Sequence, residues 1–107
     1  MENNRNTSLK KIRVRVDRDI QDLIPGYLEN REKDLTVFQQ ALEQDDFEVI
    51  ASLGHSMKGS GGGYGFNGLS SIGRAIEKAA KNRDKESVRK SIIDLTEFLN
   101  KLEVVYE

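Results

Sequence analysis

The chain of 107 residues contains no cysteine, no tryptophan, one proline and one histidine. Without cysteine it can form neither a disulfide framework nor a thiolate zinc site, and a single imidazole would need carboxylates to complete a metal site. The length suits one compact domain with one hydrophobic core. It is too short for a kinase catalytic domain, a dinucleotide-binding enzyme or an eight-stranded α/β barrel. Large enzymes are therefore excluded, and metal chemistry is disfavoured.

Long hydrophobic runs are also missing. The first eight residues contain no apolar segment that could form the core of a signal peptide. No apolar run approaches the roughly 20 residues that are needed to span a bilayer. We therefore expect a soluble, cytoplasmic protein that does not bind membranes.

Charge is distributed unevenly along the chain. Residues 1–18 hold six basic and two acidic side chains, whereas the remaining residues hold eleven basic and sixteen acidic ones. A basic arm can bind phosphate or nucleic acid. Here, however, no aromatic residue lies among the basic charges, and the acidic remainder would repel a polyanion. A solvated arm is the favoured interpretation, and nucleic acid is not expected as a partner.

Two short segments have the pattern of β-strands. Residues 12–16 alternate apolar and basic side chains with a period of two, and residues 103–106 are rich in strand-forming residues. These two segments could pair. A two-stranded ribbon is only marginally stable unless it packs on something else, so the helices that follow dominate the predicted fold.

From Asp17 onward the apolar residues recur with helical spacing, in four blocks. Asp17 is a plausible N-cap, and Pro25 either kinks the first helix or begins a new one after a short lead-in. Asp45 with Glu48 three residues later resembles a capping box. Asp84 opens the fourth block.

Short joints between the blocks make successive helices antiparallel neighbours. The fold class is therefore predicted as all-α, an antiparallel up-down four-helix bundle over residues 17–102. The basic arm 1–16 precedes the bundle and a tail of residues 103–107 follows it. The predicted core positions, in chain order, are Ile20, Leu23, Ile24, Tyr27, Leu28, Leu35, Phe38, Leu42, Phe47, Ile50, Gly54, Met57, Gly61, Tyr64, Leu69, Ile72, Ile76, Ala79, Val88, Ile92, Leu95, Leu99 and Leu102.

Residues 59–65 include five glycines in seven positions. Each glycine inside a helix is less favourable than alanine by roughly 1 kcal/mol, which favours a loop. The apolar rhythm of the second block nevertheless continues through this run to Tyr64, which favours a helix. The residue pattern alone leaves both alternatives open.

Two familiar phosphate and hydrolase motifs do not fit. A P-loop needs Gly-x-x-x-x-Gly-Lys-Ser/Thr after a strand, whereas Lys58-Gly59-Ser60 has the wrong order and follows a helical pattern. A serine hydrolase needs a Gly-x-Ser-x-Gly elbow between a strand and a helix, which is also missing.

His55, the one histidine, lies on the outward side of the second predicted helix. At roughly 100° per residue, it points about 130° away from the mean direction of the core residues. Ala51, Gly59 and Gly62 share this side, and Lys58 lies one turn away. A lone surface histidine is usually incidental. A neutral imidazole is nonetheless nucleophilic, so it can accept a phosphoryl group without an activating base, and small neighbours leave it accessible.

The residues around His55 resemble the signature of histidine phosphotransfer (HPt) domains. The match consists of the segment GHSMKGSGGGYGF at residues 54–66, followed by Leu69, Ile72, Gly73 and IEKAA at residues 76–80. The resemblance implies a monomeric four-helix bundle that keeps the glycine run inside its second helix. Met57 and Gly54 stand where the family often has Leu and Ala, and the run is richer in glycine. These departures concern the rigidity of the helix more than its chemistry.

The resemblance also implies a role for individual residues. His55 would be the phosphoacceptor, and Lys58 would stabilise the phosphate. The surface that docks the partner is assigned to Ala51, Gly59, Gly62 and Phe66. The partners would be receiver domains of response regulators and a hybrid sensor histidine kinase. The receiver would bring the acceptor aspartate and a divalent metal, so no cofactor of the chain's own and no autokinase activity are expected.

An alternative function uses the same helix without chemistry, as a module that docks a receiver or kinase and blocks it. Two further residues have predicted roles in the structure. Gly61 points to the core, so its favoured role is close helix packing. Glu77 could pair with a neighbouring base, but a solvated carboxylate is the favoured interpretation. Ser60 points away from His55 and is assigned no role.

Overall fold

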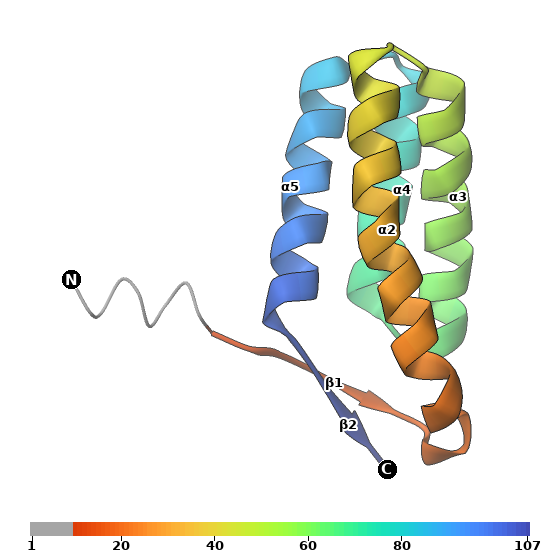
Figure 1. Cartoon of the computed structure of the whole chain (residues 1–107), viewed down its shortest axis with the longest axis vertical. Coiled ribbons are helices and arrows are strands. Elements are labelled where there is room, and N and C mark those ends of the chain that lie inside the picture. The colour runs from red at the N-terminus through yellow and green to blue at the C-terminus, as the bar shows by residue number, and fades with distance from the viewer. Residues whose placement is uncertain (1–9) are drawn as a thin grey trace, which may run out of the picture.

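Four long helices form a bundle in the computed structural model, which describes residues 10–107; Arg5 and the rest of residues 1–9 of the predicted basic arm lie outside the described residues. Figure 1 shows the helices side by side, with short joints at alternate ends, so that successive helices run in alternating directions. The predicted all-α class is confirmed. The helices are α2 (Ile24–Glu43), α3 (Phe47–Tyr64), α4 (Asn67–Lys81) and α5 (Lys85–Lys101).

The chain enters the bundle through a short 3₁₀ helix, η1 (Arg18–Leu23). Asp17 caps η1, because its carboxylate accepts a hydrogen bond from the backbone N–H of Asp19 at 2.9 Å. Pro25 then lies in the first turn of α2, where its missing N–H leaves no helical hydrogen bond unmade. Of the two alternatives for Pro25, a new helix after a short lead-in is the one observed.

The caps of α3 and α5 are aspartates. Asp84 caps α5 as predicted, by accepting from the N–H of Ser87 at 3.1 Å. The cap of α3 is Asp46, which accepts from Val49 N–H at 3.3 Å, so the prediction of Asp45 is wrong by one residue. The reason is that Asp45 takes a left-handed conformation, with φ 54°, and belongs to the turn before the helix.

The glycine run is helical. Helix α3 continues through it to Tyr64 and is followed by Gly65. With φ 91°, Gly65 has the left-handed conformation that is common at the C-terminal ends of helices. The N–H of Phe66 then bonds back to the carbonyl of Gly61 at 2.7 Å. Of the two alternatives that the residue pattern leaves open, the helix is therefore correct.

Three glycines allow α3 and α4 to approach closely. A Cβ at Gly73 would lie 2.5 Å from the backbone nitrogen of Lys58, and one at Gly54 would lie 2.8 Å from the nitrogen of Glu77. A Cβ at Gly61 would lie 2.8 Å from the nitrogen of the residue at position 70. The predicted packing role of Gly61 is confirmed. These glycines lower the helix propensity of α3 and α4, but they allow the two backbones to pack directly against each other.

The core follows the predicted helical stripes, with a few corrections. Leu23 is 54% exposed, because it ends the 3₁₀ lead-in rather than lying inside α2. In the last turn of α5 the buried side chain is Phe98, which packs against Gly68, whereas Leu99 and Leu102 are only partly buried. Among residues 10–107, no helix is long and apolar enough to cross a membrane.

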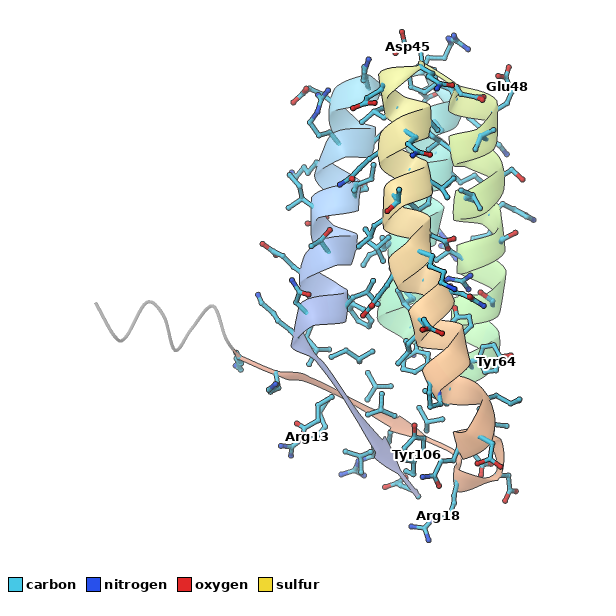
Figure 2. The ribbon with its side chains drawn as sticks, in the orientation of Figure 1. Arg13, Arg18, Asp45, Glu48, Tyr64 and Tyr106 are labelled. Carbon is cyan, nitrogen blue, oxygen red and sulfur yellow. The ribbon has the colours of Figure 1, made fainter. Side chains whose placement is uncertain are left out.

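The two ends of the described chain pair as strands β1 (Ile12–Val16) and β2 (Leu102–Tyr106). The predicted pairing is confirmed, and its direction is parallel, with Ile12 opposite Leu102. Figure 2 shows Tyr106 near the same end of the bundle as Tyr64, far from Asp45 at the other end. Val16 is 3% exposed and belongs to the same core as the helices. The ribbon thus packs on the bundle, as a two-stranded sheet requires.

Candidate functional site

His55 lies on α3 between Glu48, near one end of the bundle, and Tyr64, near the other (Figure 2). Its side chain is 67% exposed. The outward direction that helical spacing predicts is therefore confirmed. A partner can reach the imidazole from the side of the bundle rather than from an end.

Glu77 of α4 holds the ring of His55 from the neighbouring helix. The distance from His55 Nδ1 to Glu77 Oε2 is 3.1 Å, and the Glu77 side chain is 12% exposed. The expectation of a solvated carboxylate at Glu77 is therefore wrong. The carboxylate is drawn in because Gly54 and Gly73 bring α3 and α4 together at this level of the bundle.

Two lysines share the same carboxylate. Lys81 Nζ lies 3.0 Å from Glu77 Oε2, and Lys58 Nζ lies 3.3 Å from Oε1. The hydrogen bond from Lys81, and then the hydrogen bond and charge of Lys58, lower the pKa of Glu77 to about 2, although desolvation opposes the shift. Glu77 is therefore ionised at neutral pH.

The ionised carboxylate decides which ring nitrogen of neutral His55 carries the proton. A carboxylate only accepts hydrogen bonds, so Nδ1 must be the donor to Glu77. Nε2 then keeps its lone pair. The site therefore presents one exposed, nucleophilic nitrogen of fixed identity, with a lysine beside it.

The surface around His55 is open at the glycines. A Cβ at Gly59 would meet nothing within 4 Å, and one at Gly62 would meet only Ser70 Oγ, at the ordinary distance of 3.7 Å. Both glycines are exposed and Ala51 is half-buried. The structure thus brings His55, Lys58, Gly59 and Gly62 to one side of α3, as helical spacing predicts.

Phe66 does not belong to this surface. It is 0% exposed, and its ring stacks on Tyr27 of α2 with ring centroids 6.0 Å apart. Helix α3 ends at Tyr64 and the left-handed Gly65 turns the chain, so Phe66 does not continue the outward side of the helix. The assignment of Phe66 to the docking surface is therefore wrong, and the residue is part of the core.

Two serines link α3 to its neighbouring helices: Ser70 lies on α4, and Ser60 lies on α3 and contacts α2. Ser70 of α4 donates its Oγ–H to the carbonyl of Lys58 at 2.8 Å. Ser60, which the sequence left without a role, lies 2.8 Å from the hydroxyl of Tyr27 and 3.4 Å from a guanidinium nitrogen of Arg31. These contacts join residues that are far apart along the chain, so helical spacing gives no signal for them.

Metal-binding groups do not gather in the part of the chain that the structure describes. Residues 10–107 contain no set of three or more His, Cys, Asp or Glu side chains placed to hold a metal ion.

Comparison with protein families matches the Hpt domain over residues 22–104. The chain belongs to the Hpt domain family. The match includes all four long helices and both His55 and Glu77, so it confirms the resemblance that the residues around His55 carry. Hpt domains are phosphocarrier modules of two-component phosphorelays. Comparison with curated proteins and with solved structures finds no match.

Proposed function

We propose that this Hpt domain carries phosphoryl groups on His55, which it accepts from the phosphoaspartate of one receiver domain and passes to the aspartate of another. One observation carries the proposal: an imidazole that is 67% exposed donates from Nδ1 to an ionised carboxylate, which leaves Nε2 as the accepting nitrogen. An incidental surface histidine has no need of such a partner.

The transfer is an in-line displacement at phosphorus. The lone pair of His55 Nε2 forms the new P–N bond while the P–O bond to the aspartyl carboxylate breaks, and that carboxylate leaves with the electron pair. The proton on Nδ1 stays in place, so the phosphorylated ring is cationic. The carboxylate of Glu77, 3.1 Å away, compensates that charge, as the aspartate of a Ser-His-Asp triad does for its histidine.

Lys58 supplies positive charge for the phosphoryl oxygens. Its side chain is 34% exposed and its ammonium group already lies at the site, held by Glu77 at 3.3 Å. A lysine ammonium has three donors on a flexible stem, so Lys58 can move from the carboxylate to the phosphoryl group with little change elsewhere. Lys58 therefore acts as the phosphate-stabilising residue of the carrier.

The partner supplies what the carrier does not. A receiver brings the aspartate and its divalent metal, and a hybrid sensor kinase provides phosphate at the start of the relay. The docking surface is the exposed side of α3 at Ala51, Gly59 and Gly62. The carrier works as a cytoplasmic monomer and does not phosphorylate itself from ATP.

The first test is phosphate uptake. The protein is incubated with phosphorylated receiver domains, with magnesium and without ATP, and assayed for an acid-labile, alkali-stable phosphate. We expect label on the wild type and none on His55→Ala, which should keep its thermal unfolding midpoint because the side chain faces outward. Receivers that bind the protein without labelling it would favour the blocking module instead.

The role of Glu77 needs a second variant. In Glu77→Gln the side chain no longer fixes the proton on Nδ1 or compensates the cationic ring, so the rate of uptake should fall by about tenfold or more. Glu48→Gln is the matched control, since Glu48 is an exposed carboxylate of the same helix as His55. Equal rates for Glu77→Gln and Glu48→Gln would contradict the assignment.

A further inference from the structure

The outward side of α4, next to His55, is basic. Arg74, Lys78 and Lys81 follow one another at spacings of four and three residues, so they lie on one face of the helix. An open pocket of about 390 Å³ lies on this face. It reaches the phosphoacceptor site through Glu77, which lines the pocket and also contacts His55. The pocket is lined by Lys58, Arg74, Glu77, Lys78, Lys81 and Asn82.

The charges of this pocket are not balanced within the described residues. Its lining holds four cations and one carboxylate, and that carboxylate is 12% exposed and already engaged by Lys58 and Lys81. Arg74 and Lys78 are exposed, and neither forms an ion pair with any residue in 10–107. The whole chain nevertheless has a formal net charge of −1. A surface with an excess of positive charge thus lies beside His55.

We propose that this pocket binds carboxylate side chains on the surface of the receiver domain, beside its phosphorylated aspartate. The proposal rests on the function proposed above and adds a selectivity to it: receivers with an acidic flank dock faster than receivers without one. The guanidinium of Arg74 suits a carboxylate, which it can bind with two parallel hydrogen bonds. Lys78 and Lys81 add charge along the same face.

Protein carboxylates fit the pocket better than nucleic acid does. The lining contains no aromatic side chain on which a base could stack, and its four cations cover only a short stretch of surface. A polyanion would extend beyond the pocket over a chain whose overall charge is negative. An acidic patch of a folded partner, in contrast, needs to match only this one face.

Electrostatic docking of this kind acts on the encounter rather than on the chemical step. Opposite charges raise the association rate by tenfold or more, and salt reduces the effect. Within residues 10–107, neither Arg74 nor Lys78 forms a hydrogen bond or ion pair with His55, so the rate of transfer inside the complex should not depend on them. The second-order rate constant and the saturated rate therefore separate docking from catalysis.

The experiment compares two double charge reversals that change the net charge equally. Arg74→Glu/Lys78→Glu alters the pocket. Lys33→Glu/Arg89→Glu is the control, because Lys33 is exposed on α2 and Arg89 lies on the α5 flank that faces α2. Both variants replace exposed side chains, and their thermal unfolding midpoints check that both fold. The probe is a set of phosphorylated receiver domains that differ in acidic residues beside the aspartate.

At low salt, the second-order rate constant for Arg74→Glu/Lys78→Glu should fall at least tenfold with acidic receivers, with an unchanged saturated rate. Near about 0.5 M salt the difference should largely vanish, since exposed charges are then screened. The control variant should transfer like the wild type. Receivers whose flanking carboxylates are changed to amides should lose the preference for the wild type.

Three results would overturn the proposal. The first is an unchanged low-salt rate constant in Arg74→Glu/Lys78→Glu, and the second is a fall in its saturated rate. The third is salt-sensitive binding of a single-stranded oligonucleotide that this variant loses while receiver transfer is unaffected. If the wild type takes up no phosphate, the proposed function fails. Calorimetric binding of the unphosphorylated receivers then tests the pocket by itself. Weaker binding of Arg74→Glu/Lys78→Glu than of the wild type would support the proposal, and equal or absent binding would overturn it.

Discussion

Glu77 is the residue on which the site depends. A carboxylate that is 12% exposed accepts from an imidazole and two lysines, so it links α3 to α4 and sets the protonation of His55 at the same time. Such a carboxylate would be costly to leave unpaired. Its three partners compensate that cost and keep it charged. The packing of α3 on α4 and the chemistry of His55 therefore both depend on the ionised carboxylate of Glu77.

This arrangement predicts that Glu77 stabilises the fold in a pH-dependent way. Its pKa in the folded protein is lowered to about 2 from an ordinary value of 4.5. A carboxyl with a lower pKa in the folded state contributes stability that is fully present above its unfolded pKa. That contribution should be lost as the pH falls from about 4.5 to about 2. Urea unfolding at stepped pH values measures it.

The variant Glu77→Gln isolates this contribution. At pH 7 it should unfold at lower urea concentration than the wild type, and the difference should shrink steadily as the pH approaches 2. Glu48→Gln controls for the loss of one negative charge. A difference between wild type and Glu77→Gln that stays constant with pH would show that the lost stability does not come from the ionised carboxylate.

The sequence predicts His55 better than it predicts Glu77. Helical spacing relates residues of one helix, so it gives the outward direction of His55 and its open neighbours Gly59 and Gly62. Glu77 lies 22 residues away on another helix, and their contact depends on how closely the two helices approach. The docking role of Phe66, which the family resemblance implied, is wrong because α3 ends at Tyr64 and the chain then turns Phe66 into the core.

At the scale of a helix, α3 contains glycines of two kinds. Gly54 and Gly61 lie against the backbone of α4, where an added Cβ would collide with main-chain nitrogens at 2.8 Å. Gly59 and Gly63 have nothing within 4 Å of an added Cβ. The first kind is required by packing. The second kind lowers helix propensity without making a packing contact, and it leaves the surface next to His55 flat.

These two kinds of glycine predict opposite effects of alanine. Gly73→Ala, on the α4 side of the same contact, should destabilise the protein by about 2 kcal/mol or more, because backbone atoms cannot move aside for the new methyl group. Gly59→Ala should stabilise it by about 0.5–1 kcal/mol, since the helix gains propensity in open space. Thermal or urea unfolding measures both.

The same pair tests whether the flat surface serves docking. Gly59→Ala keeps His55 and Glu77 in place, so a variant that is more stable but transfers phosphate more slowly would show that α3 gives up stability for access. If Gly73→Ala proved as stable as the wild type, the close approach of α3 and α4 would be contradicted. Helix propensity alone could not have separated the two glycines, since it treats every position in a helix alike.

At the scale of the whole molecule, a two-stranded ribbon joins the two ends of the described residues. Strand β1 pairs with β2 in parallel, and the paired Arg13 and Glu103 are 90 residues apart along the chain. Their ion pair, at 3.4 Å, is exposed on both sides and contributes little. The buried Val16 fixes the ribbon to the core instead. The alternating pattern of residues 12–16 and the strand-forming residues 103–106 predicted the two strands. Their parallel direction depends on where the bundle places the two segments, which the local pattern does not give.

Contacts this distant in sequence should form last in folding, because closing so long a loop costs entropy that the local contacts of the helices do not. Val16→Ala should therefore cost about 2 kcal/mol and appear almost entirely as faster unfolding, by about thirtyfold, with an unchanged refolding rate. Ile50→Val, in the buried stripe of α3, is the control and should slow refolding. Stopped-flow urea chevrons distinguish the two, and slower refolding of Val16→Ala would mean that the ribbon forms early and guides the helices together.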